Sequence, residues 1–295
     1  MTTPSVFPGR HRVAVACAAV LGEGPIWDPR TGTLIFVDIK GHRVWRWRPD
    51  SEPVSVDVGE PVGFAVLTPD PDVLLLGRKS GLARLDLRSG EVSTGLAPEP
   101  GMPGNRLNDA AVGPDGSLYF GSMDDGEVVS TGRFYRWSAG GELSPFGEKA
   151  VVTNGPAIDP ERGVLYCADT TGGRVFRHAL GPDGTPGAPE LFVQFEEGWG
   201  HPDGMAVDVE GHVWIAHHGD SRVTRFSPDG VPVLIVPVPT AKVTKPAFGG
   251  PDLTTLFVTT AAKGRDPVLD PMAGHVYAFD VGIAGVPAEP CRLLP

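Results

Sequence analysis

Short apolar runs alternate with turns along the whole chain, and the pattern recurs six times. Each copy contains an apolar strand that ends at a turn, a second apolar strand, and an alternating strand such as RVWRW or RFYRW. Such alternation is typical of strands with one buried and one exposed face. The six turns are Asp28-Pro29, Thr68-Pro69, Gly113-Pro114, Asp159-Pro160, Asp208-Val209 and Gly250-Pro251.

Each copy provides three or four antiparallel strands in about 40–50 residues, which is the size of a propeller blade. One such sheet cannot bury its faces alone, whereas six sheets packed around an axis cover one another. No stretch free of both glycine and proline exceeds 12 residues, which excludes long helices, coiled coils and membrane-spanning helices. The sequence therefore predicts an all-β fold, a six-bladed β-propeller that forms a single domain over residues 1–295.

The N-terminal run HRVAVACAAV, residues 11–20, has two interpretations. Basic residues precede it, so it superficially resembles a signal peptide. The strand interpretation is favoured because LGEGPIWD, which belongs to the first repeat, follows at once. As a strand ahead of the first blade, it is expected to complete the last blade and close the ring.

Charge and cysteine content narrow the class of protein. The 25 Lys and Arg residues against 36 Asp and Glu residues give a net charge of −11. An acidic chain without a basic stripe is not expected to bind nucleic acid or an anionic membrane surface. The three cysteines lack a CxxC spacing, so we expect no disulfide framework and a cytoplasmic location.

One position in each repeat, five residues before the turn, carries the candidate chemistry. In a propeller the strand that contains this position lines the central channel. Five of the six residues are polar, so side chains from distant parts of the sequence are expected to converge. These residues are Glu23, Gly63, Asn108, Asn154, Asp203 and Lys245.

Two buried carboxylates that face each other, Glu23 and Asp203, require compensation. One of them could take up a proton, Lys245 could supply part of the charge, or a divalent cation could bind both carboxylates together with Asn154. Oxygen donors of this kind favour a hard cation such as Ca²⁺, Mg²⁺ or Mn²⁺. Fewer than six protein ligands would leave coordination positions for water and substrate, which is typical of a catalytic site.

Several motifs resemble one known family, the senescence marker protein (regucalcin), gluconolactonase and luciferin-regenerating enzyme group. They are LGEGPIWD with FVDIK, NRLND with GPDGSLYFGSMDDG, TNGPAID, HPDGMAVD with GHVWIA, and VTKPAFGGPDLTTLFVTTA. The resemblance is greatest to bacterial sugar lactonases of the xylonolactonase and arabinonolactonase kind. It implies a six-bladed propeller with one divalent metal ion in its channel, Ca²⁺ first, with Mg²⁺, Mn²⁺, Zn²⁺ and Fe²⁺ as alternatives.

The resemblance also implies roles for individual residues. Glu23, Asn154 and Asp203 match the family's metal ligands, and Asp203 is in addition the general base or the group that orients the attacking water. Arg106 and Asn108 match its substrate contacts. Two departures, Ala110 where the family often has glycine and a different segment at 124–131, affect the expected sugar specificity.

Five further residues are assigned from their positions along the chain. His201 lies two residues before Asp203 and is expected to contact substrate, and Lys245 is expected to contact substrate or to pair with Glu23 or Asp203. His217 and His218 are expected at the rim or in structural roles. Trp199 is a candidate for stacking on a sugar ring.

The predicted function is metal-dependent hydrolysis of a sugar (aldono-) lactone, with a small-molecule lactone as partner and a monomer or small homo-oligomer as assembly. One alternative is a metal-dependent esterase or organophosphate hydrolase on the same site. Another is a non-enzymatic calcium- or sugar-binding regulator, since a propeller fold hosts many functions. The polar channel favours sugars over hydrophobic esters, and the particular lactone and ring size stay open.

Overall fold

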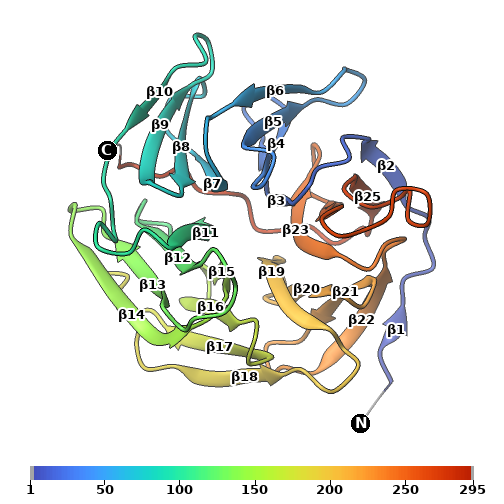
Figure 1. Cartoon of the computed structure of the whole chain (residues 1–295). Coiled ribbons are helices and arrows are strands. Elements are labelled where there is room, and N and C mark those ends of the chain that lie inside the picture. Colours follow the sequence, from blue (N-terminus) through green and yellow to red (C-terminus); the bar gives the residue numbers. More distant parts are fainter. Residues whose placement is uncertain (1–2, 294–295) are drawn as a thin grey trace.

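Six small antiparallel sheets surround a central axis in the computed structural model, which describes residues 3–293 (Figure 1). The six-bladed β-propeller predicted from the repeats is therefore confirmed, and the described residues contain no helix. None of them accordingly forms a helix that could cross a membrane.

The strands of the first three blades follow the chain from the inside of the ring outwards. Blade 1 contains β3 (Gly22–Asp28), β4 (Thr33–Asp38), β5 (Arg43–Trp47) and β6 (Val54–Asp57). Blade 2 contains β7 (Val62–Leu67), β8 (Val73–Arg78), β9 (Gly81–Asp86) and β10 (Val92–Thr94). Blade 3 contains β11 (Asn105–Val112), β12 (Leu118–Asp124), β13 (Gly132–Trp137) and β14 (Leu143–Ala150).

The remaining blades repeat this order, and two of them also receive N-terminal strands. Blade 4 contains β15 (Thr153–Asp159), β16 (Val164–Asp169), β17 (Arg174–Ala179) and β18 (Glu190–Gln194). Blade 5 contains β19 (His201–Val207), β20 (Val213–His218), β21 (Arg222–Phe226), β22 (Pro232–Pro237) and β1 (Ser5–Val6). Blade 6 contains β23 (Val243–Gly249), β24 (Thr255–Thr260), β25 (Val276–Asp280) and β2 (Arg12–Val15).

The N-terminal segment closes the ring as expected. β2 pairs antiparallel with β25 and supplies the outer strand of blade 6. The sequence reading did not identify β1, which pairs in parallel with β22 on the outer edge of blade 5. The same N-terminal segment therefore ties two neighbouring blades.

The C-terminal segment crosses one end of the channel (Figure 1, red). Val286 N–H donates to the Val207 carbonyl in blade 5, and Cys291 N–H donates to the Leu67 carbonyl in blade 2. Gly285 forms a β-bridge with Asp208. We call residues 281–293 the C-terminal strap.

The hydrophobic core is divided into six clusters, one in each seam between neighbouring blades. Blades 1 and 2, for example, share Val37 and Leu76, both fully buried, while blades 6 and 1 share Phe36 and Phe257. Apolar side chains thus hold the blades to one another. Polar side chains are left to line the axis, which is where the candidate site lies.

Candidate functional site

One end of the channel opens into a cavity of about 290 Å³ with a polar lining. Six of the seven predicted site residues lie on its wall: Glu23, Arg106, Asn108, Asn154, His201 and Asp203. They come from blades 1, 3, 4 and 5, so the ring brings together residues that are up to 180 positions apart in sequence. Lys245 is the predicted residue that does not line this cavity.

Every inner strand has a β-bulge at or beside its ring position. The regular register is interrupted between Glu23 and Ile26, between Asn154 and Ala157, and at the matching points of the other four inner strands. A bulge places an extra residue in one strand and redirects a side chain. The bulges therefore turn the polar side chains toward the axis, a device that periodicity alone does not reveal.

Gly63 explains why the sixth ring position carries no polar group. A Cβ at Gly63 would lie 2.3 Å from the Leu107 carbonyl oxygen and 2.5 Å from that of Asn108. No side chain fits there without displacing the backbone of blade 3. The close approach of the two inner strands therefore requires glycine at this position.

Glu23 and Asp203 are the electrostatic centre of the cavity. Their exposed fractions are 5% and 6%. Burial, and then the charges of Asp203 and Asp109, raise the pKa of Glu23 well above its ordinary value. Burial and Asp109 likewise raise the pKa of Asp203, whose Oδ1 is buried without a hydrogen-bond partner among the described residues. This is the conflict expected from the sequence: two carboxylates that need a cation or a proton.

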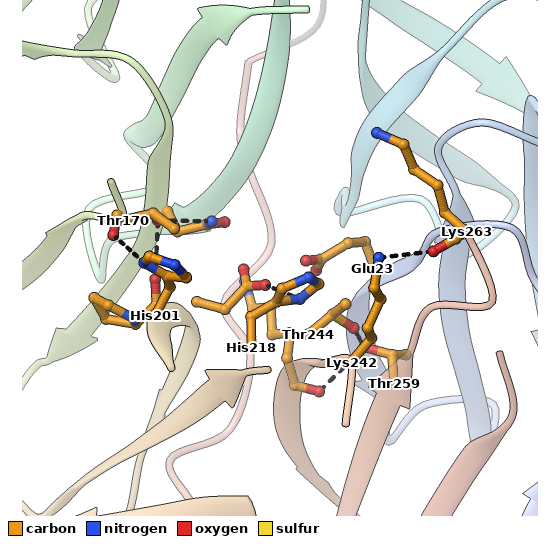
Figure 2. A network of polar contacts seen from close by, with 12 residues as sticks. Glu23, Thr170, His201, His218, Lys242, Thr244, Thr259 and Lys263 are labelled. Atoms are coloured by element: carbon orange, nitrogen blue, oxygen red, sulfur yellow. Dashed lines mark hydrogen bonds and ion pairs between the residues drawn. The ribbon is translucent and has the colours of Figure 1, made fainter. Parts of the chain in front are cut away.

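Asn154 is oriented so that its amide oxygen faces the channel. Its Nδ2 donates to Thr170 Oγ1 at 3.0 Å, and the Thr170 hydroxyl in turn donates to the Pro202 carbonyl at 2.9 Å. The Asn154 oxygen accepts from Asn108 Nδ2 at 2.9 Å and has a second lone pair free. Figure 2 shows Thr170 beside His201 on this side of the site.

The oxygen donors fit a hard cation. Within residues 3–293 no group of three or more His, Cys, Asp or Glu side chains could hold a metal ion, so a metal set here depends on the amide of Asn154 beside the two carboxylates. The partnerless Asp203 Oδ1 is the group that a cation would satisfy. That these three residues are ligands stays a prediction.

Arg106 is fixed by two partners. Its Nη1 donates to Asn108 Oδ1 at 2.5 Å, and its Nε lies 3.1 Å from Asp125 Oδ1. Asp125 also pairs with Lys40 at 2.5 Å and with Lys79 at 3.0 Å. Although partial burial opposes ionisation, these cations lower the pKa of Asp125 to about 2. Asp125 therefore stays ionised and holds Arg106 against the cavity.

The segment 124–131, expected to depart from the family pattern, contributes directly to this wall. It supplies Asp125 behind Arg106, and Glu127 lines the cavity itself. Glu127 adopts a left-handed backbone conformation with φ 60° and pairs with Lys263 at 3.2 Å. Sequence analysis predicts that this segment affects sugar specificity but identifies neither carboxylate.

Lys245 lies on the other side of the ring of polar groups. Its Nζ lies 2.5 Å from Asp109 Oδ1, and both side chains are almost fully buried. The expected pairing of Lys245 with Glu23 or Asp203 is therefore wrong. Its ammonium group pairs instead with Asp109, the residue that follows Asn108 in the sequence. Lys245 lines a second, mainly apolar cavity of about 150 Å³, together with Trp27 and Phe248 and under the C-terminal strap. A substrate contact by Lys245 has no support in this position.

His218 is the cavity residue that the sequence reading undervalued. Its Nδ1 lies 3.3 Å from Asp203 Oδ2 (Figure 2), and burial, followed by the charge of Lys242, lowers its pKa. β19 and β20 pair antiparallel, with His218 directly opposite His201. That register was the available signal: the end of the second strand meets the start of the first at the cavity.

His217 and Trp199 belong to the packing around the site. The His217 ring is fully buried, hydrogen bonds through Nδ1 to the Trp199 carbonyl at 2.9 Å, and lies against Phe195. Trp199 packs on Phe195 and under the Arg222 guanidinium. The expectation that Trp199 stacks on a sugar is wrong, because its ring is committed to this cluster and does not line the cavity.

Fold and site together define a six-bladed propeller with a polar, carboxylate-bearing cavity at one end of its channel. The SMP-30/Gluconolactonase/LRE-like region matches residues 21–262 of the chain. The protein therefore belongs to this family, and the resemblance inferred from its motifs is confirmed.

Individual relatives agree with this assignment. The chain is 36% identical over 273 residues to L-arabinolactonase of Azospirillum brasilense, covering 90% of each protein. It is 34% identical over 278 residues to 6-deoxy-6-sulfogluconolactonase of Pseudomonas putida, covering 92% of this chain and 94% of the relative. The crystal structure of the calcium-binding protein regucalcin from Agrobacterium tumefaciens superposes with a TM-score of 0.94 and 28% identity, covering 99% of this chain and all of that one.

Proposed function

We propose that the protein is a sugar lactonase that hydrolyses an aldonolactone to the aldonic acid with the help of one divalent metal ion. The observation that carries the proposal is the incomplete oxygen-donor set of Glu23, Asn154 and Asp203 in a polar cavity that Arg106 and Asn108 also line. Relatives named L-arabinolactonase and 6-deoxy-6-sulfogluconolactonase support this class of substrate.

Glu23, Asn154 and Asp203 would hold the metal ion, with Ca²⁺ as the first candidate because the donors are oxygen atoms. The regucalcin relative described as calcium-binding supports a divalent ion. When bound, such an ion polarises a carbonyl group and lowers the pKa of water. The remaining steps fall to side chains of the chain itself.

Lactone hydrolysis adds water across the acyl C–O bond: hydroxide joins the carbonyl carbon, and a proton reaches the ring oxygen that departs. Asp203, a buried carboxylate on the cavity wall, accepts the proton of the attacking water. His218 Nδ1 lies 3.3 Å from Oδ2 of the same carboxylate. Asp203 then returns the proton toward the alcohol that leaves.

Arg106 and Asn108 bind and orient the lactone. Arg106 is held by Asp125 and Asn108, so its remaining donors are aimed before substrate arrives. A preorganised guanidinium suits sugar hydroxyls, and it suits the carboxylate of the product even better. Asn108 has its amide engaged by Asn154 and by the Thr153 carbonyl, which couples the substrate wall to the proposed metal wall.

The test is proton release from freshly dissolved lactones after chelation of the protein and again after a single metal ion is restored. Xylono-, arabinono-, galactono- and gluconolactone would be compared, each against its spontaneous hydrolysis, with Ca²⁺, Mg²⁺, Mn²⁺, Zn²⁺ and Fe²⁺. Metal-dependent acceleration supports the proposal and identifies the preferred pair. Metal binding without acceleration of any lactone would refute it and favour another ester, an organophosphate or a purely binding role.

A further inference from the structure

The charges that line the cavity are compensated, with one exception. Glu23 and Asp203 would share the proposed metal ion, Arg106 pairs with Asp125, and Lys263 Nζ pairs with Glu127 at 3.2 Å. Lys242 also lines the cavity, yet it forms no ion pair with any residue in the described range 3–293. Among the described residues, it is the cation on this wall that has no counter-charge.

The Lys242 side chain is nevertheless held in place. Its Nζ donates one hydrogen bond to the Lys263 main-chain carbonyl at 2.7 Å (Figure 2). An ammonium group has three donors, so two stay available to a ligand. A neutral carbonyl fixes the position of the group without cancelling its charge.

The backbone places Lys242 beside the proposed reacting centre. Lys242 forms a β-bridge with His218, and His218 Nδ1 lies 3.3 Å from Asp203 Oδ2. Lys242 precedes β23 in blade 6, whereas Arg106 belongs to β11 in blade 3. Blades 3 and 6 lie across the ring from each other (Figure 1). Because both residues line the cavity, the two cations reach it from opposite sides.

The positive side chains stand out on a protein with a net charge of −11. Lys40, Lys79 and Arg106 surround the single carboxylate of Asp125, which leaves a local excess of positive charge behind the cavity wall. Such a local field concentrates anions although the whole molecule repels them.

From this arrangement we propose that Lys242 is a specificity-determining residue, and that the preferred substrates are sugar lactones with an additional anionic group, such as a carboxylate, phosphate or sulfonate, directed at blade 6. This inference rests on the lactonase function proposed above and names its substrate class. A lactone held by Arg106 and Asn108 would leave the opposite side of the cavity for this group, where Lys242 donates a charge-assisted hydrogen bond.

Two lactones that differ only at C6 test the proposal. D-Glucono-1,4-lactone ends in a hydroxymethyl group and D-glucaro-1,4-lactone in a carboxylate, so the ratio of their kcat/KM values isolates recognition of the charge. A 6-phosphorylated gluconolactone, compared with its neutral parent, distinguishes phosphate from carboxylate as the group recognised. Lys242→Met removes the charge and keeps the chain length, while Lys242→Arg keeps the charge.

We expect Lys242→Met to lower the ratio of charged to neutral kcat/KM by about ten- to a hundred-fold, the loss associated with one hydrogen bond to a charged group. Lys242→Arg should retain most of the ratio. Lys149→Met, which removes an exposed lysine from the outer strand β14, is the control for net charge and should leave the ratio unchanged. Melting temperatures of all variants monitor folding.

An equal fall for charged and neutral lactones, or no change in the ratio, would overturn the role of Lys242 and leave the lactonase proposal standing. A wild-type protein that hydrolyses no lactone with any metal ion would instead overturn the lactonase function and this inference with it. Binding of D-glucarate and D-gluconate, measured by calorimetry, gives a readout without turnover: the same loss of preference is expected in Lys242→Met.

Discussion

Asp203→Asn should raise the unfolding free energy of the metal-free protein and abolish its stabilisation by metal ions. The substitution keeps size and hydrogen-bonding shape but removes one of two buried like charges. In the metal-free protein it therefore relieves the conflict with Glu23. In the presence of metal it removes the ligand and proton acceptor on which activity is proposed to depend.

The free-energy cost of burying the charges of Glu23 and Asp203 together has an upper limit, which is set by the ordinary pKa of Glu23. If both carboxylates cannot stay ionised, Glu23, whose ordinary pKa is 4.5, takes up a proton. At pH 7 this costs about 3.4 kcal/mol, at about 1.4 kcal/mol per pH unit. Asp203→Asn should thus raise the unfolding free energy in EDTA at pH 7 by up to about 3 kcal/mol, or the melting temperature by about 5 °C.

The pH dependence has a defined sign. The folded-state pKa values of Glu23 and Asp203 are raised, so the folded protein holds more protons than the unfolded chain above about pH 4.5. Stability of the metal-free wild type therefore falls as the pH rises from 4.5 through the raised values. The advantage of Asp203→Asn should grow over the same range and vanish below it.

The assay is thermal and urea unfolding of both proteins from pH 4 to 8, in EDTA and with Ca²⁺. Metal at a hundred times its Kd adds about 2.7 kcal/mol to a protein that binds it only when folded. We expect this gain in wild type and none in Asp203→Asn, with lactonase activity lost in the variant. A wild type more stable than the variant in EDTA at pH 7, or an equal metal-induced gain in both, would refute the reasoning.

Three further predictions concern single side chains. Arg106→Ala should keep the metal-induced stabilisation but raise KM and lower kcat/KM by about a hundred-fold, because it deletes a charged donor while leaving the carboxylates; loss of the metal response would contradict this. His217, whose pKa burial lowers to about 3, makes the wild type lose up to about 1.4 kcal/mol of stability per pH unit as the pH falls below 6.5, and His217→Phe should flatten this limb in urea unfolding at pH 4–7. Lys245→Met leaves Asp109 buried without its cation and should cost about 3–5 kcal/mol in unfolding free energy at pH 7; Lys245→Met with Asp109→Asn should recover much of that loss if the ion pair is the cause.

The fold was predictable because a repeat multiplies a weak signal. A single alternating strand such as 43–47 is ambiguous, but six copies in the same order specify six blades. The closing role of 12–15 followed from its place ahead of the first blade. The strand 5–6 did not, because two residues carry no periodicity and their pairing with β22 is a tertiary contact.

The candidate site likewise contains residues that the repeat predicts and residues that it does not. Glu23, Asn154 and Asp203 share a position in the repeat, so alignment of the copies places them together at the cavity. His218 and Asp125 lie at or directly after the ends of the second strands β20 and β12, and their contacts depend on strand register and on a loop conformation.

Lys245 shows the limit of the repeat argument. It occupies the ring position of blade 6, but a shared position in the strand does not determine toward which end of the channel the side chain points. The Lys245 ammonium group pairs with Asp109, which follows the ring residue Asn108 of blade 3, and Lys245 lines the second, mainly apolar cavity.

The buried Lys245–Asp109 pair, with the C-terminal strap beyond it, separates the polar cavity from the opposite end of the channel. Within residues 3–293 the two cavities share no lining residue, and we expect no continuous tunnel along the propeller axis. For the proposed lactonase, we therefore expect substrate and product to pass through the same opening, one after the other. An aldonate that lingers on Arg106 would block the next lactone, and inhibition by product should be competitive and should weaken at high ionic strength.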